Sequence, residues 1–111
     1  QTTMAGGGFD HCYVLDRPRG ASQSLCAWAS SDKTGISMKM YTTQPGIQLY
    51  TGNFISDRAG KNGARYASYS GFCLETQHYP DSPNKPQWPS VVLRPGETYH
   101  SRCIYRFSVD K

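Results

Sequence analysis

The sequence feature that most restricts the fold is a series of short runs of β-branched and aromatic residues. Each run is followed by a turn-forming sequence. Runs of this length and composition are typical of β-strands, and the Gly, Pro, Asn and Asp residues between them favour turns. No segment of the sequence keeps a helical period over three turns. The sequence therefore predicts an all-β fold, an antiparallel sandwich or a barrel. The predicted strands are residues 9–15, 24–30, 36–42, 47–54, 71–77, 90–93 and 99–109.

The size, charge and hydropathy of the chain restrict its function classes. Its 111 residues fit one domain or a piece of a larger one. The net charge of +4 comes from scattered Lys and Arg, without the basic stripe that nucleic-acid binding needs. No apolar run approaches the roughly 20 residues of a membrane helix. We therefore expect neither a nucleic-acid partner nor a membrane span, and the start at Gln1 is expected to reflect processing or truncation.

Four widely spaced cysteines, without a C-x-x-C pair, leave two arrangements open. Each lies within a strand-like run, where a free thiol serves as a small core residue, and this is the expected arrangement. Two disulfides, in any of three pairings, are the alternative. The three histidines show no paired-ligand spacing with the cysteines, so we expect no zinc site. The cysteines are Cys12, Cys26, Cys73 and Cys103.

Strand alternation singles out one polar side chain in each of three predicted strands, because neighbouring residues of a strand face opposite sides of the sheet. They are Asp10 in 9–15, Gln48 in 47–54 and Glu75 in 71–77, each among otherwise apolar positions. The three groups could gather in a concave site on the sheet, or each could face solvent on its own strand. The pattern leaves both arrangements open.

Glu75 is the strongest candidate for acid–base chemistry. It lies between Leu74 and Thr76, and partial burial there would raise the pKa of its carboxyl toward neutrality, which suits a proton shuttle. Together with Asp10 it could form a carboxylate pair of the glycosidase kind. Four aromatic residues in or after these strands could stack on a flat ligand such as a sugar, or pack in the core. They are Tyr50, Phe54, Tyr79 and Trp88.

Four segments carry a more specific signal: GGGFDHCYVL (6–15), YTTQPGIQLYTGNF (41–54), GFCLETQHYPDSPNKPQWPSVVLRPGETY (71–99) and YRFSV (105–109). In this order and at this spacing they resemble the C-terminal part of the aldose 1-epimerase family, also called galactose mutarotases. The resemblance implies a large antiparallel β-sandwich, no metal or organic cofactor, and a cytoplasmic location, or secretion if the Gln1 start marks processing. Enzymes of this family interconvert the α- and β-anomers of galactose and glucose by opening the sugar ring.

The resemblance also implies roles for the same three residues. Glu75, by its place in LETQ, matches the glutamate that takes the proton from the anomeric hydroxyl. Asp10 in FDH matches the aspartate that binds sugar hydroxyls, and Gln48 in PGIQLYTGNF matches a glutamine at the sugar site of some members. The family's catalytic histidine, which protonates the ring oxygen, belongs to an upstream motif that this sequence does not contain.

Residues 1–111 thus resemble only the C-terminal segment of a mutarotase-like sandwich domain. Alone, the chain is expected to lack the general acid, and loss of a positioned acid or base costs about 10²–10⁴-fold in rate. Its sheets are expected to lack strand partners, so that the missing N-terminal part of the protein, or self-association, would cover the exposed edges. The alternative function is a lectin-like module that binds galactose without catalysis.

Overall fold

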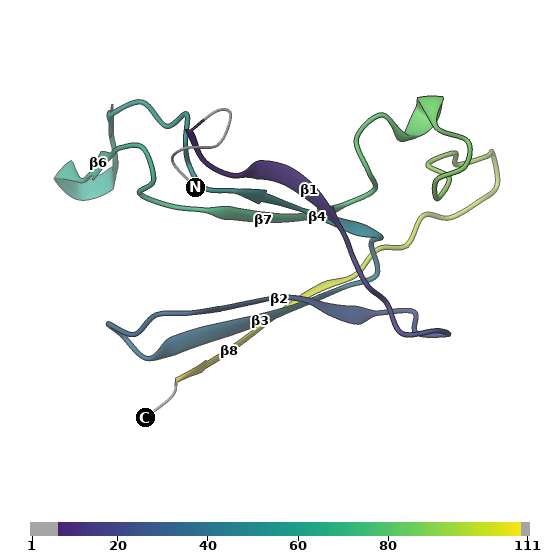
Figure 1. The fold of residues 1–111 in the computed structure, drawn as a ribbon, viewed down its shortest axis with the longest axis horizontal. Helices are drawn as coiled ribbons and strands as arrows, with labels where there is room; N and C mark the ends of the chain where they lie inside the picture. The colour runs from purple at the N-terminus through teal and green to yellow at the C-terminus, as the bar shows by residue number, and fades with distance from the viewer. Residues whose placement is uncertain (1–6, 110–111) are drawn as a thin grey trace. The chain divides into compact units, whose positions relative to one another are not determined.

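The computed structural model describes residues 7–109, which divide into two compact units (Figure 1). The first unit comprises residues up to Tyr13 together with Gln48–Glu75. The second unit comprises Val14–Ile47 together with the residues from Thr76 onward. No helix in the described range is long and apolar enough to cross a membrane.

The sheet of the second unit is antiparallel and has the strand order β2-β3-β8. Its strands are β2 (Ser24–Ser30), β3 (Ile36–Thr42) and β8 (Cys103–Val109). A tight hairpin joins β2 to β3, where the amide of Ser31 donates to the carbonyl oxygen of Ile36 at 2.9 Å. Strand β8 runs beside β3 along its whole length, with Ile36 opposite Val109 and Thr42 opposite Cys103 (Figure 1). Strand β3 is therefore the central strand of this sheet and pairs with both β2 and β8.

The hydrophobic core of the second unit is small. The side chain of Met40, in the middle of β3, is 0% exposed, and Ile47 is also buried. Thr42, two residues after Met40 on the same face of β3, is fully buried as well. The buried side chain of Gln44 follows, and its Nε2 donates to the hydroxyl of Ser101 at 2.8 Å. This contact holds the segment that leads into β8 against the end of β3.

Strand β2 carries an irregularity at Cys26. The pairing register with β3 shifts between Leu25 and Ala27, so that Cys26 is the extra residue of a β-bulge. Its thiol donates to the carbonyl oxygen of Met40, with 3.2 Å between the two atoms. Burial raises the pKa of the Cys26 thiol, and the nearby Cys103 raises it further. All four cysteines are free thiols in the structure.

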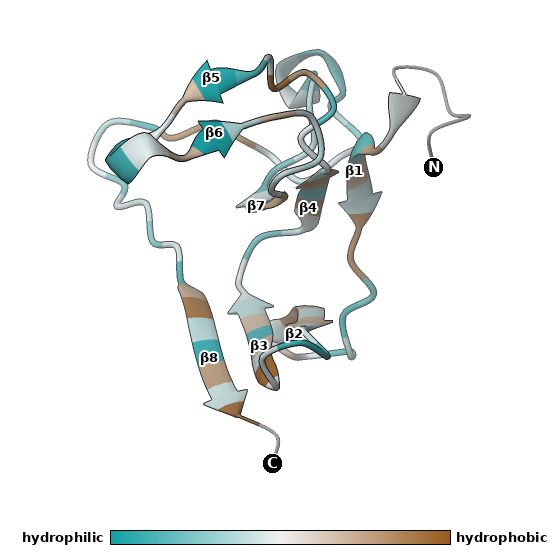
Figure 2. Ribbon diagram, turned by 90° about the vertical axis from the view of Figure 1, so that its left-hand side faces the viewer, coloured by the Kyte–Doolittle hydropathy of each residue, from teal (hydrophilic) through white to brown (hydrophobic). Residues whose placement is uncertain are grey.

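Strand β8 is exposed over its whole length, although much of it is hydrophobic (Figure 2). Large apolar side chains on it, listed from its start, are Ile104, Tyr105, Phe107 and Val109, and each is exposed. Among residues 7–109, β8 pairs with β3 alone, and its other edge carries no strand. Such an edge offers unpaired backbone groups and apolar side chains to another strand.

A second sheet has the strand order β1-β4-β7. Its strands are β1 (Asp10–Val14), β4 (Gly46–Tyr50) and β7 (Cys73–Gln77). Between β4 and β7 the first unit forms a short hairpin, whose strands are β5 (Arg58–Ala59) and β6 (Arg65–Tyr66) and which includes the 3-10 turn η2 (Lys61–Gly63). An ion pair between Asp57 and Arg65 closes this hairpin at its base.

The predicted all-β fold is confirmed, and the strands predicted at 24–30 and 36–42 have the observed bounds. The strand predicted at 47–54 ends at Tyr50, and the one predicted at 99–109 begins only at Cys103.

The strand predicted at 90–93 is wrong. Val91, Val92 and Leu93 are exposed and irregular, because this short run lies between Pro89 and Pro95 and finds no strand partner in the described part of the chain. The hairpin of β5 and β6 was not predicted, since its two-residue strands lie within Gly-rich sequence that reads as a loop.

Candidate functional site

The three polar residues singled out by strand alternation lie on the three strands of one sheet. Asp10 opens β1, Gln48 is in the middle of β4, and Glu75 is in the middle of β7. Because the strand order is β1-β4-β7, Gln48 lies on the central strand, with a carboxylate-bearing strand on either side. All three residues also belong to the first compact unit.

Asp10 and Gln48 are in direct contact. The side-chain Nε2 of Gln48 donates a hydrogen bond to Oδ1 of Asp10 at 2.8 Å. The two side chains therefore lie on the same face of neighbouring strands, which is one of the two arrangements that the alternation pattern left open. The amide holds one carboxylate oxygen of Asp10, and the carboxylate has further lone pairs that could accept hydrogen bonds from a ligand's hydroxyl groups.

The partial burial expected for Glu75 is not observed. Along β7, Leu74 and Thr76 are half-buried, whereas Glu75 between them is exposed. The reason is the strand's alternation: Glu75 points to the face opposite Leu74 and Thr76, and its exposure shows that no other part of residues 7–109 covers that face at Glu75. The Glu75 carboxylate is therefore accessible from solvent.

The segment that leads into β7 contains an unusual backbone conformation at Tyr69. Tyr69 has a φ of 64°, a left-handed conformation that is rare for a bulky side chain. Its amide donates to the carbonyl oxygen of Gly52 at 3.0 Å, and its hydroxyl donates to the carbonyl oxygen of Gly7 at 2.6 Å. Both ends of Tyr69 are thus tied to other segments of the first unit. Strain of this kind persists where surrounding contacts determine the backbone, as at ligand sites.

The four candidate aromatic residues divide into two pairs. Tyr50 and Phe54 stack with ring centroids 6.3 Å apart, and Phe54 is 66% exposed in the first unit, which also contains Gln48. Tyr50 lies two residues after Gln48 on β4, so both side chains point to the same face of the sheet. The exposed ring of Phe54 in this pair could carry the apolar face of a sugar ring.

Tyr79 and Trp88 form the other pair, in the second unit. Their rings meet edge to face with centroids 5.5 Å apart, and the Tyr79 hydroxyl donates to the carbonyl oxygen of Pro45 at 3.2 Å. The Tyr79 hydroxyl is therefore used within the fold, and we assign this pair to loop packing.

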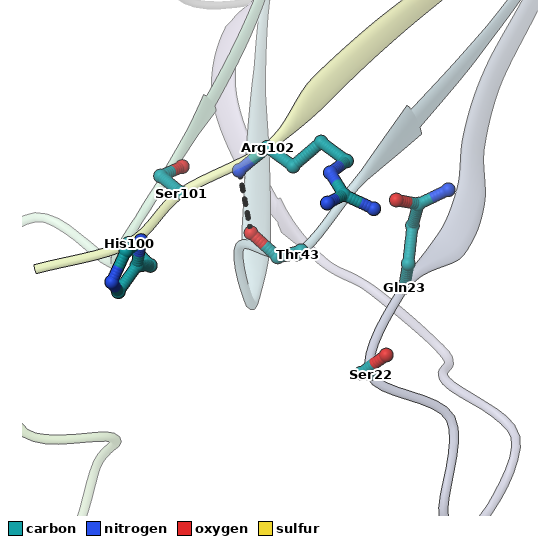
Figure 3. A pocket seen from close by; sticks show the side chains of 6 residues that line it. All are labelled: Ser22, Gln23, Thr43, His100, Ser101 and Arg102. Atoms are coloured by element: carbon teal, nitrogen blue, oxygen red, sulfur yellow. Dashed lines mark hydrogen bonds between the residues drawn. The ribbon is translucent and has the colours of Figure 1, made fainter.

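The second unit also contains a polar hollow of about 240 Å³ (Figure 3). Its lining residues are Ser22, Gln23, Thr43, His100, Ser101 and Arg102. In Figure 3 the guanidinium of Arg102 points toward Gln23, whereas the ring of His100 lies apart and points away from it. In ligand sites the polar groups converge on one point, and the polar groups that line this hollow do not. Residues 7–109 also contain no group of three or more His, Cys, Asp or Glu side chains placed to hold a metal ion.

Comparison with known proteins identifies what the chain is similar to. The family model described as aldose 1-epimerase matches residues 1–106. The chain is 48% identical over 103 residues to the galactose mutarotases of Mus musculus and Homo sapiens, covering 92% of this chain and 30% of each relative. It is 38% identical over 104 residues to the aldose 1-epimerase of Escherichia coli (strain K12), covering 90% of this chain and 29% of that protein.

A solved structure shows the same fold. The crystal structure of the GalM/aldose epimerase homologue from C. elegans superposes with a TM-score of 0.84 at 30% sequence identity. The match covers 95% of this chain and 31% of that chain. The chain therefore spans about 30% of the length of the relatives it matches.

Proposed function

Because the chain belongs to the aldose 1-epimerase family, we propose that it supplies the catalytic base and part of the sugar site of an enzyme that interconverts the α- and β-anomers of galactose and glucose. In this proposal Glu75 is the general base, and Asp10 and Gln48 bind sugar hydroxyls. Residues 1–111 would then be the C-terminal segment of a mutarotase-like domain.

The hydrogen bond between Gln48 and Asp10 is the observation that best supports this proposal. It joins two of the three candidate residues on adjacent strands, and the strand that carries Glu75 lies on the other side of Gln48. A sugar bound over the central strand could donate hydrogen bonds from its hydroxyl groups to the Asp10 carboxylate. Its anomeric hydroxyl could then face Glu75, an exposed carboxylate with free access to solvent and ligand.

The proposed reaction needs one base and one acid. Glu75 takes the proton from the anomeric hydroxyl, the bond between C1 and the ring oxygen breaks, and the ring oxygen receives a proton. The open-chain aldehyde then rotates about its C1–C2 bond and closes from the opposite face by the reverse steps. The acid is proposed to be a histidine in the part of the relatives' length that lies outside this chain.

Polarimetry tests this function directly. The protein at its natural full length is expected to accelerate the change in optical rotation of freshly dissolved α-D-galactose, whereas the 111-residue chain alone is expected to be about 10²–10⁴-fold slower for lack of the acid. Galactose that binds to the full-length protein without a change in rate would establish the lectin-like alternative instead. Cleavage of galactosides would point to a glycosidase and would refute the epimerase.

The exposed strand β8 leads to a proposal about partners. We propose that the missing N-terminal part of the protein covers β8, and that the 111-residue chain alone covers it by self-association. The support is the exposed apolar surface of a strand whose outer edge has no partner among the described residues.

Light scattering on the isolated chain tests the second half of this proposal. At concentrations near 10 µM, a range in which exposed apolar surface drives association, we expect dimers or larger species. Phe107→Glu, on β8, is expected to shift the chain toward monomer, because it places a charge on the apolar edge strand. Val92→Glu is the matched control, since Val92 is 64% exposed and Phe107 is 65% exposed, but Val92 lies in a loop. A monomeric wild-type chain would refute self-association.

A further inference from the structure

The main chain just before Asp10 is held by the turn that follows β4. The amide of Phe9 donates to Oγ1 of Thr51 at 3.0 Å, and the amide of Thr51 donates back to the carbonyl oxygen of Phe9 at 3.1 Å. The side-chain amide of Asn53 donates to the same carbonyl oxygen at 3.0 Å. The hydroxyl of Thr51 also lies 2.6 Å from Oδ1 of Asn53. Phe9 is therefore bound on both sides of its backbone by two side chains of one turn.

Gly8 leaves room for this arrangement. A Cβ atom at position 8 would lie 2.3 Å from Oδ1 of Asn53 and 2.8 Å from Oγ1 of Thr51, so these two side chains would have to move to admit it. Gly8 is itself buried. The two polar side chains thus occupy the space that any other residue at position 8 would need.

These contacts act on Asp10 through the backbone. The carbonyl group of Phe9 belongs to the peptide bond that joins Phe9 to Asp10, and this peptide is planar and rigid. Fixing the carbonyl oxygen of Phe9 therefore fixes the direction in which β1 begins and the position of the Asp10 Cα atom. The same turn begins directly after Tyr50, two residues beyond Gln48, so it holds both partners of the Asp10–Gln48 hydrogen bond in register.

We propose that Thr51 and Asn53 are positioning residues that aim the Asp10 carboxylate at the sugar. This inference rests on the proposed sugar-binding role of Asp10. Neither side chain touches the sugar; they act by holding the Phe9 peptide. A displacement of a positioned group by about 1 Å can cost up to 10²-fold, so loss of these hydrogen bonds has a measurable effect on sugar affinity.

The test uses Thr51→Val in the protein at its natural full length, because valine keeps the branched shape of threonine and replaces the hydroxyl by a methyl group that forms no hydrogen bond. Galactose Kd, measured by titration calorimetry, is expected to rise about tenfold. Thr51→Ser keeps the hydroxyl and is expected to restore the affinity to within about twofold of wild type. Thr34→Val is the matched control, since the Thr34 hydroxyl also accepts a backbone amide, that of Ile36, but in the β2–β3 hairpin.

A double-mutant cycle separates positioning from general destabilisation. In an Asp10→Ala background, Thr51→Val is expected to change the galactose Kd by less than about twofold, because the residue acts through Asp10. An equal loss in both backgrounds would overturn the proposal, and so would an unchanged Kd in Asp10→Ala itself. Asn53→Ala is the second variant. It is expected to raise the galactose Kd in the wild-type background and to change it by less than about twofold in the Asp10→Ala background.

Two further measurements distinguish failure of this inference from failure of the proposed function. Hydrogen exchange of the Phe9 amide is expected to speed up at least about tenfold in Thr51→Val, because the amide loses its acceptor. Faster exchange without weaker galactose binding would overturn the positioning role, whereas the polarimetric rate of the wild-type protein would still report on the epimerase. Conversely, a wild-type protein that binds galactose without anomerising it would end the epimerase proposal and leave the Kd comparison valid.

Discussion

Replacement of Glu75 by Gln is expected to lower the rate of galactose mutarotation by about 10²–10⁴-fold, the usual effect of removing a general base. Glutamine keeps the size and hydrogen-bonding reach of glutamate but cannot take up the proton of the anomeric hydroxyl. Because Glu75 is exposed on β7, the substitution leaves no buried group unpaired, and the fold is expected to be unaffected. Galactose affinity should stay within about threefold of wild type, since catalysis and ground-state binding are separable in this way.

Glu97→Gln is the matched control for this prediction. The carboxylate of Glu97 accepts the amide of Arg94 at 2.7 Å in a turn of the second unit, so the same chemical change is made at a structural glutamate. Polarimetry and calorimetric titration should be performed on the protein at its natural full length. An unchanged anomerisation rate in Glu75→Gln would remove Glu75 from the mechanism. A parallel loss of rate and affinity would reassign it to sugar binding.

Replacement of Met40 by Ala is expected to lower the free energy of unfolding by about 2–5 kcal/mol, the range for large-to-small changes at buried sites. Met40 is 0% exposed and lies in the central strand β3, between Ala27 on β2 and Tyr105 on β8. The core around it is small, so the cavity left by the lost atoms has few neighbours that could move in to fill it. A loss of this size is a large share of the stability of an ordinary domain.

Met38→Ala provides the comparison for Met40→Ala. Met38 lies two residues earlier on the same face of β3 but is only half-buried, so its truncation should cost less than half as much. Urea denaturation of both variants and of wild type measures the difference, with equal m-values as the sign that a two-state comparison is valid. Equal losses in the two variants would show that Met40 is not the centre of this core.

Much of the candidate site could be predicted from the sequence because it depends on a local rule. The two-residue period of a strand is enough to place Asp10 and Gln48 on sheet faces, and the structure joins the two side chains by a hydrogen bond. Their strands are far apart in the sequence, and alternation alone could not tell whether they would be neighbours. The family resemblance supplied that expectation, and the strand order β1-β4-β7 agrees with it.

Other features could not be predicted because they depend on contacts between distant segments. The exposure of Glu75 is set by which parts of the chain cover β7, and alternation says nothing about coverage. The run 90–93 has the composition of a strand but no strand partner among residues 7–109. The strand predicted there from composition alone was therefore wrong. The hydrogen bonds of Thr51 and Asn53 reach back to Phe9 across more than 40 residues, and the signal for them lay only in the segment TGNF.

The lack of room for a side chain at position 8 has a consequence for protein engineering. Replacing glycine by alanine is a standard way to stabilise a protein, because it reduces the freedom of the unfolded chain. At Gly8 that change would force the side chains of Asn53 and Thr51 to move, and these are the side chains that hydrogen-bond the Phe9 backbone. A mutant library should therefore vary positions 8, 51 and 53 as one unit, because an alanine at position 8 contacts both of the other side chains.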